Sequence, residues 1–417
     1  MAPPIAPPHA PSTRAFLAGA ALAAVVLLAP CAGAQQRYTR AQVVAAALTS
    51  QPLIALAGAD SASAAADVST ARAYPNPTFS FQYTKDIPRH HSILDIPLDF
   101  PWVRSSRIGA ATAGQQAASL RLGLARASVA FAAETSYARV LALEEHARLG
   151  RRDALDADSL LHMARRRLEA GDASELDVHL AEVNAGQLEN TAQDDSLTAV
   201  LALLDLQRLM GIMADTPAIA LTDSLDIPAA DPPAGDSPSV GAPFAVAAAR
   251  ADLAAADRSY TFERRNVFAA PSFQAGIEGG DPTGQEPGAL PLFGISLPLP
   301  LFDRHGGTIA VAAAARERAR AQLAVATRES DAERLRATHE RMLAVARAQR
   351  DRGLLAAADT VARMSLAAYS EGASALPNVL EAQRNARGML LQFVDDVAAA
   401  EVADAALRLA TATSKVP

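Results

Sequence analysis

Apolar and polar residues alternate in four short stretches of the chain, and two of these stretches lead into long helical patterns. In residues 293–301 large apolar side chains fill every second position, so an extended chain carries them on one side. The predicted strands span about 77–84, 93–100, 271–278 and 291–301, each with one apolar face. The residues expected on those faces are Phe79, Phe81, Tyr83, Leu94, Ile96, Leu98, Phe273, Ile277, Phe293, Ile295, Leu297 and Leu299.

Alanine-rich segments follow the second and fourth strands. Residues 105–167 contain no proline and place large apolar residues at three-, four- and seven-residue spacings. A helix of that length extends about 90 Å, which is typical of a coiled coil and not of a globular domain. The predicted long helices span about 105–167, 175–213, 308–370 and 376–411.

The two halves of the chain share this order of elements. An offset of 201 residues carries Pro97 onto Pro298 and Gly171 onto Gly372, and it also aligns Ile108 with Ile309 and Ala181 with Ala382. We therefore predict an internal two-fold repeat. The predicted organisation is a signal peptide (1–34), a first repeat (35–213), a linker (214–243), a second repeat (244–412) and a tail (413–417).

Proline and glycine punctuate both copies. Pro97, Pro298, Asp303 and Gly307 mark the predicted strand-to-helix corners. At the opposite ends, Gly171 and Gly372 supply backbone freedom for the turns between paired helices, with Ser174 and Ser374 close behind.

The N-terminus has the pattern of a secretory signal. Arg14 precedes the apolar segment Ala15 to Ala29, and Ala32-Gly33-Ala34 provides a small-residue cleavage site. Cleavage there would remove Cys31, the single cysteine. The alternative is a lipoprotein signal with a lipidated Cys31, although Pro30 is unfavourable before such a cysteine.

Composition excludes several classes of function. The 417-residue chain is 50% hydrophobic but only 5% aromatic, and its net charge of -7 argues against nucleic acid as a partner. No catalytic or nucleotide-binding motif is present, so we expect no enzyme activity, no cofactor and no bound metal.

Four strands with one apolar face each cannot seal themselves in lipid, because an open sheet leaves unpaired edges. Three copies would give twelve strands with the apolar side outward and Thr, Ser, Gln, Asp and Gly inward, the pattern of an outer-membrane barrel. The expected fold is mainly α with a small β part: long antiparallel helical hairpins that form an α-barrel, plus four strands per protomer.

The chain resembles the TolC family of outer-membrane efflux ducts. The corner SLPLPLFDR is similar to that of the heavy-metal branch, the CzcC and CusC type, and RRLEAGDASELDVHLAEVN and AAYSEGASALPNVLEAQRN resemble the family's two periplasmic tips. The resemblance implies a homotrimer in the outer membrane with its helices in the periplasm. It also implies a periplasmic adaptor and an inner-membrane resistance-nodulation-division pump as partners.

In that family, acidic residues after the tip glycines narrow the entrance. The matching positions here are Asp177, Asn378 and Glu381, and Asn378 departs from the usual aspartate. Pro377 is expected to loosen the first turn of its helix. The alternative is that Asp177 and Glu381 are solvated charges favoured by the helix dipole.

Three histidines and the single tryptophan lie near the predicted strands. His90-His91 is expected in the outer turn of the first hairpin and His305 in the second corner, both as exposed loop residues and not as metal ligands. Trp102 suits either an interfacial belt or a buried packing role.

The expected function is a passive exit duct of a tripartite efflux system for metal ions or small toxic compounds. The alternatives are a periplasmic adaptor, a structural coiled-coil protein of an export system, and a duct for type I protein secretion. The sequence does not distinguish among metal, drug and polypeptide as cargo.

Overall fold

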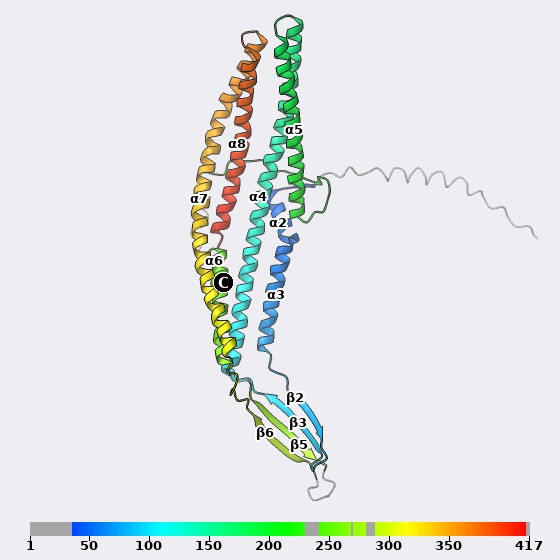
Figure 1. Ribbon diagram of the computed structural model, residues 1–417, viewed down its shortest axis with the longest axis vertical. Coiled ribbons are helices and arrows are strands. Elements are labelled where there is room, and N and C mark those ends of the chain that lie inside the picture. Colours follow the sequence, from blue (N-terminus) through cyan, green and yellow to red (C-terminus); the bar gives the residue numbers. More distant parts are fainter. Residues whose placement is uncertain (1–35, 230–241, 268–269, 281–287, 414–417) are drawn as a thin grey trace, which may run out of the picture.

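The structure is a computed structural model that describes residues 36–229, 242–267, 270–280 and 288–413. The molecule is elongated, with a small sheet at one end and the turns of two helical hairpins at the other (Figure 1). The predicted signal peptide with Cys31 lies outside the described residues. So do residues 230–241 of the predicted linker and residues 414–417 of the predicted tail.

Two helical hairpins form the long arm of the molecule. α4 (Pro101–Glu169) turns back into α5 (Glu175–Leu209), and α7 (Gly306–Ser370) turns back into α8 (Leu376–Thr411). Their buried surface is rich in alanine, as the composition indicated. Small side chains at these contacts let the helices pack closely. Fully buried examples are Ala133, Ala164, Ala337, Ala348 and Ala400.

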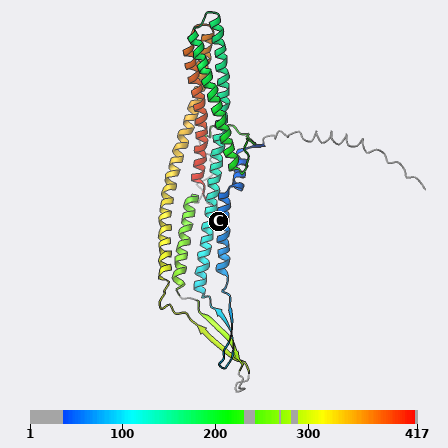
Figure 2. The same ribbon diagram turned by 45° about the vertical axis from the view of Figure 1, so that its right-hand side comes forward.

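Three shorter helices extend the arm toward the sheet. α2 (Arg40–Ser50) and α3 (Pro52–Arg72) precede β2 (Thr78–Tyr83), and α6 (Phe244–Arg265) precedes β5 (Ser272–Gly279) (Figure 2). α3 and α6 pack against α4, and α6 also packs against α7. Among the described residues, no single helix is long and apolar enough to cross a bilayer; only α2 and α3 taken together, bent by 52°, pass that test of length and composition.

The sheet contains four antiparallel strands in the order β2-β3-β5-β6. Pairing of β3 with β5 joins the two hairpins at the centre of the sheet. β2 and β6 are the outer strands, and one edge of each pairs with no other strand of the described chain. The strand bounds are β2 (Thr78–Tyr83), β3 (His90–Pro97), β5 (Ser272–Gly279) and β6 (Leu290–Ser296).

Several element ends differ from the predicted bounds, and proline or glycine accounts for most of the differences. Pro101 begins α4, four residues before the predicted start, because a proline is well suited to the first helical position. β6 ends at Ser296, because Pro298 and Pro300 cannot donate ladder hydrogen bonds. α5 ends at Leu209 and not at residue 213, because Gly211 adopts a φ of 79° and reverses the chain.

A two-stranded parallel sheet was not predicted from the sequence. β1 (Gln36–Tyr38) pairs with β4 (Ile219–Leu221), which lies inside the segment predicted as a linker. Strands of three residues are too short to show a period-two pattern. The linker is therefore partly structured, and it anchors the start of the described chain beside the middle of the helical arm (Figure 1).

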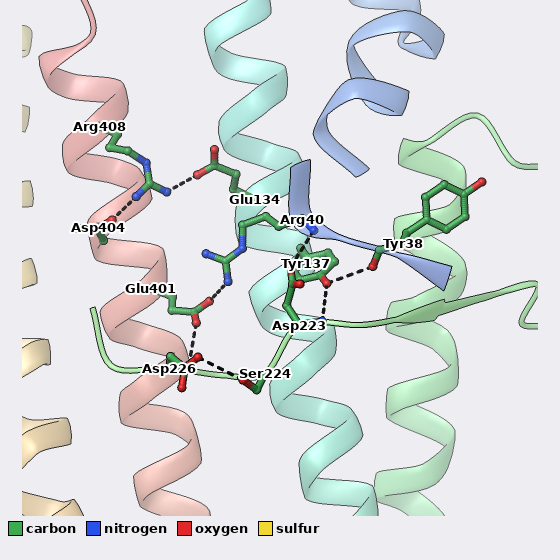
Figure 3. A network of polar contacts seen from close by, with 10 residues as sticks. All are labelled: Tyr38, Arg40, Glu134, Tyr137, Asp223, Ser224, Asp226, Glu401, Asp404 and Arg408. Carbon is green, nitrogen blue, oxygen red and sulfur yellow. Dashed lines mark hydrogen bonds and ion pairs between the residues drawn. The ribbon is translucent and has the colours of Figure 1, made fainter. Parts of the chain in front are cut away.

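Side chains fix this small sheet against α4 and α8 (Figure 3). Tyr137 donates its hydroxyl hydrogen to the Tyr38 carbonyl at 3.3 Å and accepts a hydrogen bond from the Asp223 amide at 3.3 Å. Arg40 pairs with the carboxylate of Glu401, which is only 6% exposed. Burial raises the pKa of Glu401, and the positive charge of Arg40 opposes that shift.

The two halves of the chain meet along α4 and α8, which run antiparallel. Pairs of acidic and basic side chains recur along this seam: Glu134 with Arg408, His146 with Asp395 at 3.0 Å, and Asp153 with Arg387 at 3.6 Å. Apolar residues pack between the pairs, including Ala142, Leu149 and Val394. Contacts from both halves thus hold the two hairpins side by side.

Substitution of Gly211 by alanine should destabilise this junction. A Cβ atom there would lie 2.5 Å from Cβ of Ser50, and the φ of 79° is strained for any side chain. We expect Gly211→Ala to lower the free energy of unfolding by about 1–3 kcal/mol, measured by thermal loss of helical circular dichroism. Gly186→Ala is the control: it lies in the interior of α5 with open space around it, and it should stabilise by about 0.5–1 kcal/mol. Equal effects of the two variants would contradict this account.

Candidate functional site

One face of the four-stranded sheet is apolar and exposed. Directly opposed residues of antiparallel strands point to the same face, so the register identifies each row of side chains. One row runs from Phe79 through Leu94 and Ala275 to Phe293. In the next row, Ile96 opposes Phe273 and Phe273 opposes Ile295.

All twelve residues predicted to face lipid are exposed in the isolated chain, from 37% for Phe273 to 77% for Ile295. Nine of them lie in the strands on this single face, and the other three, Leu98, Leu297 and Leu299, follow the ends of β3 and β6. Nothing in the described chain covers these side chains. We name the face formed by these twelve residues the apolar sheet face.

The opposite face of the sheet is mostly polar. Thr78, Asp95 and Gln274 form one row across three strands. In a second row, Gln82 opposes His91, which opposes Glu278. A sheet that separates lipid from water requires an apolar face toward the lipid and a polar face toward the water.

The two histidines of the first hairpin lie in a strand and not in its turn, so that prediction was wrong. β3 begins at His90, which pairs with Tyr83. Nδ1 of His91 lies 3.1 Å from Oε1 of Glu278 on β5, and its Nε2 lies 3.3 Å from the hydroxyl of Thr84. Among the described residues, no group of three metal-ligating side chains could hold a metal ion.

The corners between sheet and helices have different geometry in the two halves. Pro97 ends β3, and Pro298 follows the end of β6. In the second corner Asp303 accepts a hydrogen bond from the amide of His305 at 2.8 Å, while His305 adopts a left-handed φ of 59° and caps α7. Gly307 is the second residue of that helix and has no positive φ.

Trp102 lies in the first turn of α4, where the strand region meets the helices. Its ring stacks on Phe100 with centroids 4.4 Å apart, yet 52% of its surface is exposed. The residue thus combines a packing contact with an open face. The structure therefore does not place it in a buried core.

The turns between paired helices form the distal tips. Gly171 and Gly372 have φ values of 84° and 76°, and hydrogen bonds bridge each turn, such as that from the Asp172 amide to the Arg167 carbonyl at 2.8 Å. Ser174 caps α5 and exchanges hydrogen bonds with Asp177. The second tip has no such cap, because Ala375 holds the equivalent position and Ser374 only contacts Asn378 at 3.5 Å.

The three residues expected to narrow the entrance, Asp177, Asn378 and Glu381, follow these tips. The carboxylate of Asp177 accepts hydrogen bonds from the amide and the hydroxyl of Ser174, at 3.1 and 3.0 Å. In this structure Asp177 is therefore part of the N-terminal cap of α5. Asn378 and Glu381 are exposed in the first turns of α8. Pro377 lies within that first turn, where the backbone amide has no helical acceptor, so the proline removes no helical hydrogen bond there.

A contact between the two tips was not predicted from the sequence. Arg167 of α4 donates to the carbonyl of Tyr369 of α7, and its guanidinium lies 4.6 Å from the centre of the Tyr369 ring. Tyr369 is 2% exposed, and burial raises its pKa, an effect that the charge of Arg167 opposes. Residues 202 positions apart give no local signal, so this pairing could be found only in three dimensions.

Comparison with known proteins identifies the fold. No family model matches the chain, and no curated protein matches it either. Solved structures do: the outer membrane protein VceC from Vibrio cholerae is 17% identical, with a TM-score of 0.72 over 90% of this chain and 96% of that chain. CusC, whose structures describe transmembrane channel formation, is 16% identical, with a TM-score of 0.74 over 90% and 92%.

The Campylobacter jejuni CmeC outer membrane channel is also similar, at 15% identity and a TM-score of 0.72 over 89% of this chain and 85% of that chain. At such low identities the likeness shows the fold. The fold is that of a TolC-type outer-membrane channel. The resemblance predicted from the corner and tip sequences is thereby confirmed, with a CusC-type protein among the matches.

Loss of Arg167 should loosen the tips. Arg167→Ala removes both the hydrogen bond to Tyr369 and the contact with its ring. We expect amide hydrogen exchange in residues 366–373 to accelerate on the order of tenfold, as a loss of about 1–2 kcal/mol implies. Arg166→Ala, an exposed neighbour on the same helix, is the control and should leave exchange unchanged. Unchanged exchange in both variants would show that the contact does not hold the tips.

Proposed function

We propose that this protein is the subunit of an outer-membrane exit duct for a tripartite efflux system. The strands would span the outer membrane, and the helices would extend the passage into the periplasm. The observation that carries the proposal is the apolar sheet face, which lies at one end of two long helical hairpins. Transport through the duct would be passive, because the chain offers no motif that could couple it to an energy source.

The exposed apolar side chains support a place in lipid. Large residues such as Phe293 and Ile295 are 71% and 77% exposed, a costly arrangement in water. In hydrocarbon the same side chains would be solvated. The polar row of Thr78, Asp95 and Gln274 would then face an aqueous lumen.

The unpaired edges of β2 and β6 support assembly with identical copies. Unsatisfied backbone groups are not tolerated in hydrocarbon, so the sheet has to close. β6 of one copy would pair with β2 of the next, and three copies of the four-stranded sheet would supply twelve strands. We therefore propose a homotrimer.

The tips support a role in contact with other components. They lie at the end of the arm farthest from the sheet, where a periplasmic adaptor and an inner-membrane resistance-nodulation-division pump would meet the duct (Figure 1). Metal ions or small toxic compounds are the proposed cargo. The similarity of the corner to the heavy-metal branch supports this choice.

A charge on the apolar sheet face should prevent assembly in the membrane. Ile295→Arg places a cation on the proposed lipid side of β6 and should cost about 2–4 kcal/mol per subunit if the site lies near the bilayer centre. We expect the wild type to appear in outer-membrane fractions as a heat-modifiable trimer and to conduct ions in planar bilayers, and the variant to lose most of that trimer.

Thr78→Arg is the matched control for this experiment, because it places the same cation on the polar face of the same sheet. It should still assemble and conduct. Equal tolerance of both substitutions would contradict the assignment of the two faces. Recovery of wild-type protein only from the soluble periplasm would contradict the proposed function as a whole.

Glu381 is proposed to line the entrance at the tip. Three copies of this carboxylate would attract cations by a focused field. We expect Glu381→Gln to lower the cation-over-anion permeability ratio on the order of twofold, measured from reversal potentials in a salt gradient. Glu329→Gln, an exposed substitution in the middle of α7, is the control. A ratio that is unchanged by Glu381→Gln would instead favour a solvated helix-start charge.

A further inference from the structure

Arginine side chains gather at the junction where the sheet meets the helical arm. α3 and α6 end there and α4 and α7 begin there, so four helix ends lie close to the sheet (Figure 1). Each helix end brings an arginine: Arg72 in the last turn of α3, Arg104 in the first turn of α4, Arg264 in the last turn of α6, and Arg304 two residues before α7. We name these four residues the arginine collar.

The protein itself neutralises little of the charge of the arginine collar. Among the described residues, no carboxylate forms an ion pair with Arg72, Arg264 or Arg304, and all three are exposed. Only Arg104 has such a partner, the buried carboxylate of Asp99 at 3.7 Å. The helix dipole favours a cation where α3 and α6 end, but it favours an acid where α4 and α7 begin, and neither of these helices has an acid in its first turn. The arginine collar therefore offers positive charge to a partner outside the chain.

Exposed aromatic rings lie beside the arginine collar. Phe302 is fully exposed and lies between the end of the apolar sheet face and Arg304. In the first half of the chain, Tyr74 is 69% exposed, and the guanidinium of Arg104 lies 4.5 Å from the centre of its ring. Trp102 is 52% exposed in the same helical turn as Arg104. Amphipathic rings and basic side chains at one level are typical of a membrane–water interface.

The distance from apolar to charged residues fits the thickness of a headgroup layer. Leu301 is 68% exposed and is the last residue of the alternating apolar series. The backbone between Leu301 and Arg304 spans at most ~10 Å. The polar region of a bilayer is roughly 5–8 Å thick on each side of the hydrocarbon. A Leu301 side chain in hydrocarbon would thus place Arg304 at the level of the lipid phosphates.

We propose that the arginine collar binds the anionic headgroups of phospholipids in the leaflet that faces the periplasm. Guanidinium groups donate paired hydrogen bonds to phosphate oxygens and are weakly hydrated, so they suit a phosphate at the edge of hydrocarbon. Lipids with a net negative charge would bind there in preference to zwitterionic lipids. The inference rests on the proposed function, because the arginine collar meets headgroups only if the sheet spans a bilayer.

The test measures lipid binding by the purified protein in detergent, with phosphatidylglycerol and phosphatidylcholine as the probes. Native mass spectrometry gives an apparent dissociation constant for each lipid. We expect the wild type to prefer phosphatidylglycerol on the order of tenfold, and the double variant Arg72→Gln/Arg304→Gln to lose most of that preference. Arg72→Lys/Arg304→Lys should retain most of it, because both charges remain. The matched control is Arg328→Gln/Arg334→Gln, which removes two exposed charges from the middle of α7 and should behave as the wild type.

Three results would overturn the lipid site. They are equal affinity of the wild type for the two lipids, a loss of preference in the control as large as that in Arg72→Gln/Arg304→Gln, and displacement of phosphatidylglycerol by an equal concentration of soluble glycerol phosphate. The last result would indicate a site for free phosphate and not for a membrane. Insertion of the wild type into vesicles of each lipid is measured separately. Failure to insert into either kind of vesicle would contradict the proposed function, whereas insertion into both with equal lipid affinities would contradict only the lipid site.

Discussion

A single copy of this chain can neither cover the apolar face of its open sheet nor pair the outer edges of that sheet, and this constraint governs the rest of the structure. The apolar sheet face has no helix over it, and the outer edges of β2 and β6 have no partner strand among the described residues. Solvation in lipid and pairing with further copies, as proposed above, would resolve both problems at once. The helices are consequently free to leave the sheet from one end and to form a long arm instead of a cover.

The arm itself depends on close packing through small side chains and on polar contacts between distant segments. Alanine at the helix contacts keeps the helices near one another, while the pairs along α4 and α8 fix which residues face each other. A buried charge such as Glu401 is tolerated because Arg40 and the Asp226 amide satisfy it. Such contacts specify how the helices are aligned along their length, which a contact surface of alanine alone would not determine.

Much of the fold could be predicted from the sequence, because alternation and helical spacing are local signals. They identified the four strands, the four long helices and the exposure of residues such as Phe79 and Leu297. Turn chemistry identified Gly171 and Gly372. The pairing of β3 with β5, the short strands β1 and β4, and the contact of Arg167 with Tyr369 depend on residues far apart in the chain.

Neighbouring strands in β2-β3-β5-β6 run in opposite directions, and this alternation limits the numbers of strands that can close into a ring. Each half of the chain contributes a whole hairpin, so the two outer strands of a copy always run in opposite directions. Copies can therefore be joined in a ring without a parallel junction, whatever their number. Gain or loss of one strand would bring two parallel strands together at one junction, whereas gain or loss of a hairpin would keep every neighbouring pair antiparallel. The circumference of the ring can thus grow only in even steps.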